Sequence, residues 1–203
     1  MTVYKTTTPD EALAAASRCL DGQEGLIVYS GQKGIFVMTG QYPSYDAGFC
    51  HAFNIRVGKT IYFGGSIVSF AGDLELCEIH FGPSDFGPNA INHICQWLVD
   101  MGICANIDGN DLMVDEKKVG SFAMASTITG WYESVAHFSI NTNLHLIQRI
   151  CTKPMEKTPG ALSEYSINAD MIWNELLRAG IVPETDDNMK GDHEYGDFPN
   201  EDS

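Results

Sequence analysis

The chain has 203 residues, of which 44% are hydrophobic, and a formal net charge of −15, so it is long enough for one domain with a substantial core. The acidic balance argues against binding to nucleic acid, which requires a basic surface. No apolar run is long enough to span a bilayer, and the first residues lack the apolar segment of a secretory signal. We therefore expect a cytoplasmic protein that binds neither nucleic acid nor a membrane.

Six cysteines are present, and no two are spaced as C-x-x-C. Buried reduced thiols are the expected state in a cytosolic protein, and no His or Cys pair has the spacing of zinc ligands. We therefore expect six free thiols and no zinc site, and the sequence offers no set of metal ligands of its own.

The first third of the chain begins with a helix signal. Thr8–Glu11 reads Thr-Pro-Asp-Glu, a capping box with proline in the first turn, and predicts a helix that ends near Gly22. The β-rich runs Leu26–Tyr29 and Ile35–Thr39 are separated by Gly-Gln-Lys-Gly, which predicts a hairpin. Residues 41–58 are polar, aromatic and rich in turn formers, and they are predicted to form a long loop.

The middle of the chain alternates between strand-like and helical patterns. Strands are predicted at Thr60–Phe63, Ile67–Phe70 and Leu74–Phe81. Apolar residues then recur at helical spacing over Ile91–Val99, and Gly102 ends that helix.

The last third is predicted to contain four short strands, followed by a helix and a final helix capped by Asn168, in the order Ile103–Ile107, Asp111–Val114, Val119–Ala125, Val135–Asn141, Asn143–Ile150 and Asn168–Ala179. The order of elements predicts an α+β fold in which helices pack on a mixed, mostly antiparallel sheet. The domain is expected to cover residues 1–182. Residues 183–203 are expected to form an acidic disordered tail, because residues 184–203 carry eight acids and one lysine and few large apolar groups.

Two glycine-containing segments and one histidine are candidates for chemistry. Gly64-Gly65-Ser66 lies between strand-like runs, where the absence of Cβ atoms lets the backbone approach a ligand, although an ordinary hairpin turn has the same pattern. Residues 109–125, GNDLMVDEKKVGSFAMA, contain two short strands joined by a charged turn, which alone indicates only a solvated hairpin. His137 lies in the apolar run AHFSIN, so it is interpreted as a hydrogen-bonded core or sheet residue and not as a general base.

Together, these segments resemble the lipoate and biotin protein ligase superfamily. Asn110-Asp111-Leu112 followed by Lys118-Val119-Gly120 resembles its "N-D-[IL]-x-V-…-K-[IVL]-x-G" stretch. Gly64–Val68 resembles the glycine-rich strand pair that holds the acyl chain, and Ser139–Asn141 resembles the strand that follows the lysine hairpin. Gly34–Gln41 resembles an early strand of the family. The resemblance covers about residues 8–180 in the family's order.

The resemblance implies acyl transfer to a lysine of an acceptor protein, such as a lipoyl or biotinyl domain. Lys118 would stabilise the acyl carbonyl of a small acyl ligand, and the substrate-binding residues would include Gly64, Gly65, Ser66 and Gly120. Asn110 and Asp111 would hold the nucleotide or its metal. A ligase would use ATP with Mg. A thioester-dependent octanoyl transferase would need neither, and Cys151 is its candidate nucleophile.

The sequence also departs from the family pattern. Tyr62 and Phe63 stand where the family has an arginine pair, and Ser69 or Phe70 matches a family histidine. Two alternatives therefore remain open: a catalytically degenerate protein that binds a nucleotide, an acyl ligand or a partner protein, and an amidase that removes a lipoyl or biotinyl group.

Overall fold

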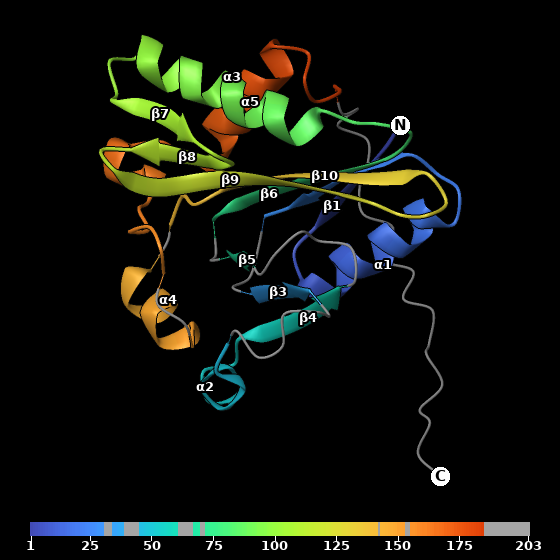
Figure 1. Cartoon of the computed structure of the whole chain (residues 1–203), viewed down its shortest axis with the longest axis horizontal. Coiled ribbons are helices and arrows are strands. Elements are labelled where there is room, and N and C mark those ends of the chain that lie inside the picture. Colours follow the sequence, from blue (N-terminus) through green and yellow to red (C-terminus); the bar gives the residue numbers. More distant parts are fainter. Residues whose placement is uncertain are drawn as a thin grey trace.

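Two β-sheets, one of seven strands and one of three, organise the chain in this computed structural model (Figure 1). The structure describes residues 1–30, 34–38, 45–60, 67–69, 72–141, 143–152 and 155–184. The large sheet has, in spatial order, the strands β1 (Thr2–Thr6), β2 (Gly25–Tyr29), β6 (Leu74–Phe81), β10 (Trp131–Phe138), β9 (Lys117–Ser126), β8 (Asp111–Val114) and β7 (Ala105–Asp108). Its neighbouring strands are antiparallel except for the pair β1 and β2. The small sheet has the order β4 (Arg56–Thr60), β3 (Gly34–Met38) and β5 (Ile67–Ser69).

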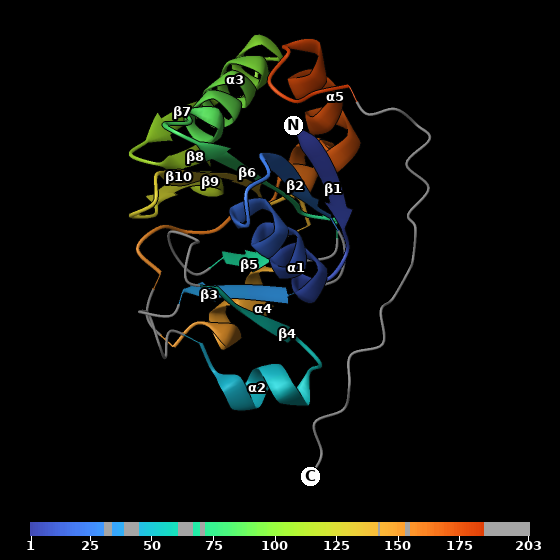
Figure 2. The same ribbon diagram turned by 90° about the vertical axis from the view of Figure 1, so that its right-hand side faces the viewer.

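Helices cover both faces of the large sheet (Figures 1 and 2). The long helix α3 (Phe86–Asp100) and the helix α5 (Ala169–Arg178) lie on one face. The helix α1 (Pro9–Leu20) and the small sheet lie on the other face; the short helix α2 (Ala47–Ala52) lies beyond the small sheet, and the short helix α4 (Leu144–Ile150) lies at its level. Within the described ranges, no helix combines the length and the apolar character needed to cross a membrane.

The main hydrophobic core lies between the large sheet and α3 with α5. Alternate strand residues such as Leu76 and Phe138 point into it and meet Ile91 of α3, and all three are 0% exposed. Under α1, a smaller core contains Ala12 and Ala15, whose short side chains let the helix lie close to the sheet.

Most of the predicted elements are confirmed. The capping box at the start of α1 is present, with Thr8 accepting from the Glu11 backbone N–H. The strand Leu74–Phe81 has the predicted bounds, and Asn143 and Asn168 cap α4 and α5 through their side chains. The predicted α+β class, with a mostly antiparallel sheet, is therefore correct.

Two local predictions are wrong. The runs at Leu26–Tyr29 and Ile35–Thr39 do not form a hairpin, because β2 pairs with β1 and β6 in the large sheet, whereas β3 pairs with β4 and β5 in the small one. Residues 41–58 are not a long loop, because Asp46 caps the helix α2 and β4 begins at Arg56. The predicted tail lies almost entirely outside the described residues, which end at Glu184.

Candidate functional site

The Lys118 hairpin is fixed by a tight turn and by a neighbouring segment. Asp115 and Glu116 both have positive φ, 47° and 64°, as a two-residue turn between twisted strands requires. The Lys118 N–H donates to the Thr158 carbonyl over 2.8 Å, and the Gly160 N–H donates to the Lys118 carbonyl, also over 2.8 Å. The backbone of Lys118 is therefore held on both sides, while its side chain remains 39% exposed.

A β-bulge sets the direction of the Lys118 side chain. Leu112 pairs with Gly120 and Met113 pairs with Lys118, so Val119 is an additional residue on β9. Val119 belongs to the core under α3, and a Cβ atom on Gly120 would lie 2.8 Å from the His137 carbonyl oxygen and 3.5 Å from Ile91 Cδ1. Gly120 is thus closely packed on the face of the large sheet that α3 covers, and Lys118 projects from the opposite face.

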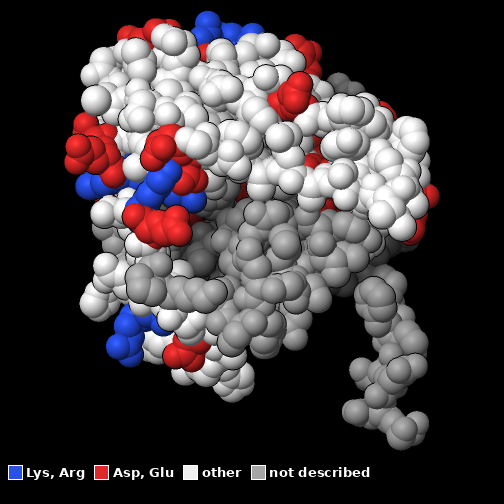
Figure 3. All heavy atoms as spheres, in the orientation of Figure 1, with Lys and Arg blue, Asp and Glu red and all other residues white. Residues whose placement is uncertain are grey.

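Two lysines share one carboxylate beside this hairpin. Lys118 Nζ lies 2.7 Å from Asp111 Oδ1, and Lys157 Nζ lies 2.9 Å from Asp111 Oδ2. Lys157 also reaches Asp108 Oδ2 at 2.9 Å. Burial alone would raise the pKa of Asp111, but hydrogen bonds from Lys118 and Lys157 outweigh burial and lower it. Figure 3 shows acidic and basic side chains gathered at the end of the molecule where β7, β8 and β9 lie.

A row of polar residues runs from this cluster across the whole large sheet. Each member is the direct cross-strand partner of the next, so all point to the face that the small sheet and α1 cover. In spatial order the row is Thr6, Tyr29, Glu75, His137, Ser121, Asp111 and Asp108. The row therefore joins the charged cluster around Lys118 to the buried polar residues Glu75 and His137 on the same face of the sheet.

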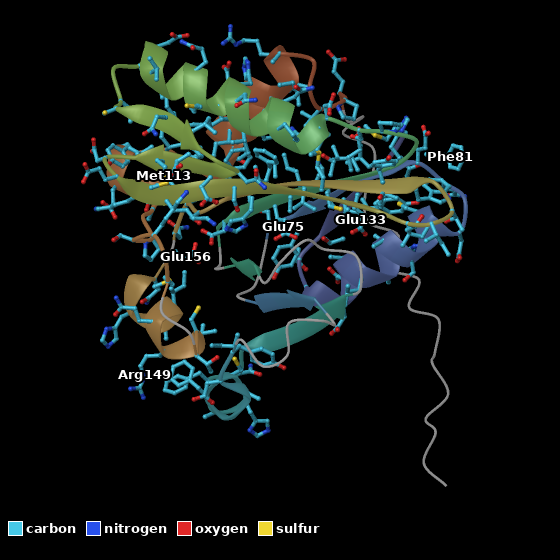
Figure 4. All side chains as sticks on the ribbon, in the orientation of Figure 1. Glu75, Phe81, Met113, Glu133, Arg149 and Glu156 are labelled. Atoms are coloured by element: carbon cyan, nitrogen blue, oxygen red, sulfur yellow. The ribbon has the colours of Figure 1, made fainter. Side chains whose placement is uncertain are left out.

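The interior part of this face contains titratable groups that are deeply buried. Glu75, Glu133 and His137 are 2%, 2% and 6% exposed. His137 Nδ1 lies 3.7 Å from Glu75 Oε2, beyond hydrogen-bonding distance, and neither atom has a hydrogen-bond partner. Figure 4 shows Glu75 and Glu133 between the large sheet and the layer formed by the small sheet and α1. His137 is thus a buried sheet residue, as predicted, but its ring is only partly hydrogen-bonded.

The buried carboxyl group of Glu133 has a strongly raised pKa. Both of its carboxylate oxygens are buried without a hydrogen-bond partner. Burial, and secondarily the negative charge of Glu75, raise its pKa from 4.5 to about 8. The carboxyl group is therefore mostly neutral at pH 7.

The other predicted site residues fall in several places. Asp111 lies beside Lys118, whereas Asn110 is exposed in the turn before it, where its carbonyl accepts from the Phe122 N–H. The predicted ligand-binding residues Gly64, Gly65 and Ser66 lie outside the described residues.

Cys151 lies apart from the hairpin, at the end of α4. It forms an isolated bridge with Tyr45, and burial raises the pKa of its thiol. A nucleophilic cysteine needs a lowered pKa, so this environment does not favour Cys151 as a nucleophile. All six cysteines are free thiols.

Sequence reasoning missed three of the residues gathered here, namely Lys157, Glu75 and Glu133. Lys157 belongs to no motif, and only the chain path from α4 back to β9 brings it to Asp111. Glu75 and Glu133 sit in strands whose alternation is compatible with exposure, and only the second layer of the fold buries them. For Glu75 the available signal was a carboxylate flanked by Leu74 and Leu76 in a predicted strand, whereas Glu133 preceded the predicted strand Val135–Asn141 and carried no such signal.

Comparisons with known proteins show which solved structures share this fold. No protein-family model matches the sequence, and no curated protein matches it. P. falciparum LipL1, solved with lipoate, has a TM-score of 0.69 and 13% identity, and the match covers 87% of this chain and 60% of LipL1. A bipartite lipoate protein ligase from Thermoplasma acidophilum, studied with its E2 lipoyl domain, has a TM-score of 0.69 and 16% identity, covering 87% of this chain and 80% of that one. A lipoate-protein ligase A bound with ATP has a TM-score of 0.70 and 15% identity, with 87% and 82% covered.

The chain therefore has the fold of the lipoate protein ligase catalytic domain. It spans about 60% of the length of LipL1 and most of the length of the other two. The resemblance noted in the sequence is confirmed for the fold.

Proposed function

We propose that the protein transfers an acyl group from a small carboxylic acid to a lysine of an acceptor protein, and that Lys118 stabilises the acyl carbonyl. The observation that carries the proposal is the position of Lys118, a cation whose side chain is held at the end of a polar row that continues into the interior of a ligase-like fold. A positioned ammonium group stabilises the negative charge that develops on the carbonyl oxygen during acyl transfer.

Lys157 supports this proposal as a second cation. Asp111 is only 18% exposed and binds both ammonium groups, so it remains paired with Lys157 when Lys118 turns toward a ligand. Leaving a partly buried carboxylate unpaired would be costly, and Lys157 removes much of that cost. Two adjacent lysines also suit the phosphate of an acyl-adenylate, which is consistent with the use of ATP.

The same geometry is less suited to Mg. Both Asp111 oxygens are taken by ammonium groups, and the described residues contain no group of three His, Cys, Asp or Glu side chains arranged to hold a metal ion. We assign no metal ligand, and we propose that only the positive charges of Lys118 and Lys157 would bind the phosphates of ATP. A lipoyl or biotinyl domain is the proposed acceptor, because the T. acidophilum ligase was studied with a lipoyl domain.

A catalytically degenerate protein that binds the ligand without turnover is the second candidate. Two observations favour it: Tyr62 and Phe63 replace the family's arginine pair, and Lys118 is engaged by Asp111 at 2.7 Å.

Incubation of the purified chain with ATP and, in turn, lipoate, octanoate or biotin distinguishes these candidates. Formation of pyrophosphate and of an acyl-adenylate by mass spectrometry supports the ligase, and loss of both in Lys118→Ala assigns the role of the lysine. Ligand binding with no pyrophosphate supports the degenerate protein. Acylation from an acyl-carrier thioester without ATP would instead indicate a transferase.

A further inference from the structure

The turn that precedes Lys118 is formed by residues that do not favour its backbone conformation. Asp115 and Glu116 join β8 to β9, and both have positive φ, 47° and 64°. A two-residue turn of this kind usually contains glycine, because the left-handed region costs free energy for a residue with a Cβ atom. Aspartate tolerates this region better than glutamate does. Interactions from elsewhere in the molecule must therefore offset the strain of the turn, above all at Glu116.

Tyr165 supplies such an interaction from a distant part of the sequence. Its hydroxyl donates to Asp115 Oδ2 over 2.6 Å, and the two residues are 50 positions apart. Hydrogen bonds that a carboxylate accepts are shorter and stronger than those between neutral groups. The Asp115 N–H also donates to the Cys104 carbonyl over 3.1 Å. Asp115 is thus held through both its side chain and its backbone.

The phenol of Tyr165 is itself firmly placed. Tyr165 is the last residue of the 3-10 helix η1 (Leu162–Tyr165), and its half-buried ring packs against the main core. Leu162 is 0% exposed, and its N–H donates to the Ser139 carbonyl over 2.9 Å. The hydrogen bond to Asp115 raises the pKa of Tyr165 to about 12, so the hydroxyl remains a donor at neutral pH.

Lys118 lies between this turn and the β-bulge. β9 begins directly after the turn, Lys118 is its second residue, and Val119, the additional residue of the bulge, follows at once. The bonds to Thr158 and Gly160 hold the Lys118 backbone on the side away from β8. On the β8 side, the turn and the bulge determine how β9 twists against its partner. A change in the turn is therefore transmitted to the direction of the Lys118 side chain.

We propose that Tyr165 is a positioning residue for the acyl-transfer site. By holding Asp115 it keeps the turn in its left-handed conformation, and it thereby fixes the direction in which Lys118 projects. Tyr165 acts only through the turn and does not touch the ligand. The inference rests on the proposed function, in which Lys118 stabilises the acyl carbonyl.

Tyr165→Phe tests this role, because it removes only the phenolic oxygen. The full chain is assayed with ATP and lipoate, octanoate or biotin for acyl-adenylate formation, or for ligand affinity if it binds without turnover. We expect the rate or the affinity to fall about 10-fold to 100-fold, since a displacement of about 1 Å at a reacting group can cost about 100-fold. Full function in Tyr165→Phe would overturn the proposal.

Glu164→Gln is the matched control. Glu164 is the neighbouring residue of η1, and it bonds to Lys117 of the same hairpin at 2.7 Å. Both of these side chains are exposed, so their ion pair contributes little and its loss should leave function nearly unchanged. A loss as large as that of Tyr165→Phe would mean that any contact between η1 and the hairpin has the same effect, and it would contradict a specific role for Tyr165.

Glu116→Gly provides a rescue that a general loss of stability would not show. Glu116 is exposed, and glycine has no penalty at positive φ, so this substitution removes the strain that Tyr165 offsets. In the Glu116→Gly background, Tyr165→Phe should therefore cost much less function than in the wild-type background. Equal losses in the two backgrounds would show that Tyr165 acts independently of the turn. Circular dichroism should find each variant folded, and an unfolded Tyr165→Phe would make Tyr165 a requirement of the fold and overturn the positioning role.

Lys118→Ala separates this inference from the proposed function. If Lys118→Ala loses function and Tyr165→Phe keeps it, the acyl site stands and the positioning role of Tyr165 is wrong. If neither acyl-adenylate formation nor ligand binding depends on Lys118, the proposed function fails, and the positioning role fails with it.

Discussion

Glu133→Gln should stabilise the ligand-free protein, and the gain should grow with pH. The pKa of Glu133 is raised in the folded state to about 8, from 4.5, because the carboxyl group is buried near Glu75. Between these two values the folded state keeps the proton while the unfolded state loses it, so wild-type stability falls as pH rises. Glutamine has the shape of the neutral acid and does not titrate, so the variant escapes this loss.

The size of the effect follows from the same two pKa values. The difference in the free energy of unfolding between variant and wild type should open near pH 4.5 and widen by about 1.4 kcal/mol for each pH unit. It should reach about 3.4 kcal/mol at pH 7 and level off above pH 8.

Urea unfolding of both proteins at a series of pH values from 4.5 to 8.5 measures this difference. Glu156→Gln removes one negative charge from an exposed position and controls for the change in net charge. A difference between Glu133→Gln and wild type that stays constant over the whole range would refute the reasoning, because it would mean that the Glu133 carboxyl group titrates alike in both states.

Three further changes test other parts of the structure. Gly120→Ala should destabilise the fold by about 1–3 kcal/mol in urea unfolding, because the new Cβ would lie 2.8 Å from the His137 carbonyl oxygen and the bulge would have to shift; an unchanged midpoint would show that the bulge is misplaced. Thr8→Ala should cost about 1 kcal/mol by removing the α1 cap, whereas Thr7→Ala removes only an exposed hydrogen bond to Glu11 Oε2 and should cost less; equal losses would mean that the Thr8 cap contributes nothing specific. Deletion of residues 184–203 should leave the melting temperature nearly unchanged, since this acidic segment contains few large apolar groups to bury, and a drop of many degrees would show that it docks on the domain.

Local patterns in the sequence predicted the elements that depend on local interactions. The α1 capping box, the strand Leu74–Phe81 and the apolar face of α3 are each encoded within a few residues, and each is present. The strand β1 was missed because only its pairing with β2 stabilises it, and the division between two sheets was missed because β3 pairs with strands that follow it. Such pairings depend on contacts between residues that are far apart in the sequence, and local propensity does not encode them.

The candidate site likewise combines residues that a local motif marked with residues that only the three-dimensional structure brings together. The motif spacing marked Asp111 and Lys118 as candidate site residues, but only the structure shows that their side chains lie 2.7 Å apart. The polar row requires the register of seven strands to be correct at once, so the neighbourhood of Glu75, His137 and Ser121 could not be derived from the order of residues. Lys157 reaches Asp111 only because a segment without regular secondary structure runs beside β9.

The role of Lys118 is tested most directly by comparing Lys118→Ala with Lys117→Ala in acyl-adenylate formation and ligand binding. Lys117 is the matched control, because it pairs with Glu164 at 2.7 Å while Lys118 pairs with Asp111. Lys118→Ala should lose about 2.7–4 kcal/mol of transition-state stabilisation, a fall of about 100-fold to 1,000-fold in rate or a comparable loss of tight binding, while remaining folded. Lys117→Ala should retain nearly full function. Equal behaviour of the two variants, or full function in Lys118→Ala, would contradict the proposed site and leave the likeness to lipoate protein ligases as one of fold alone.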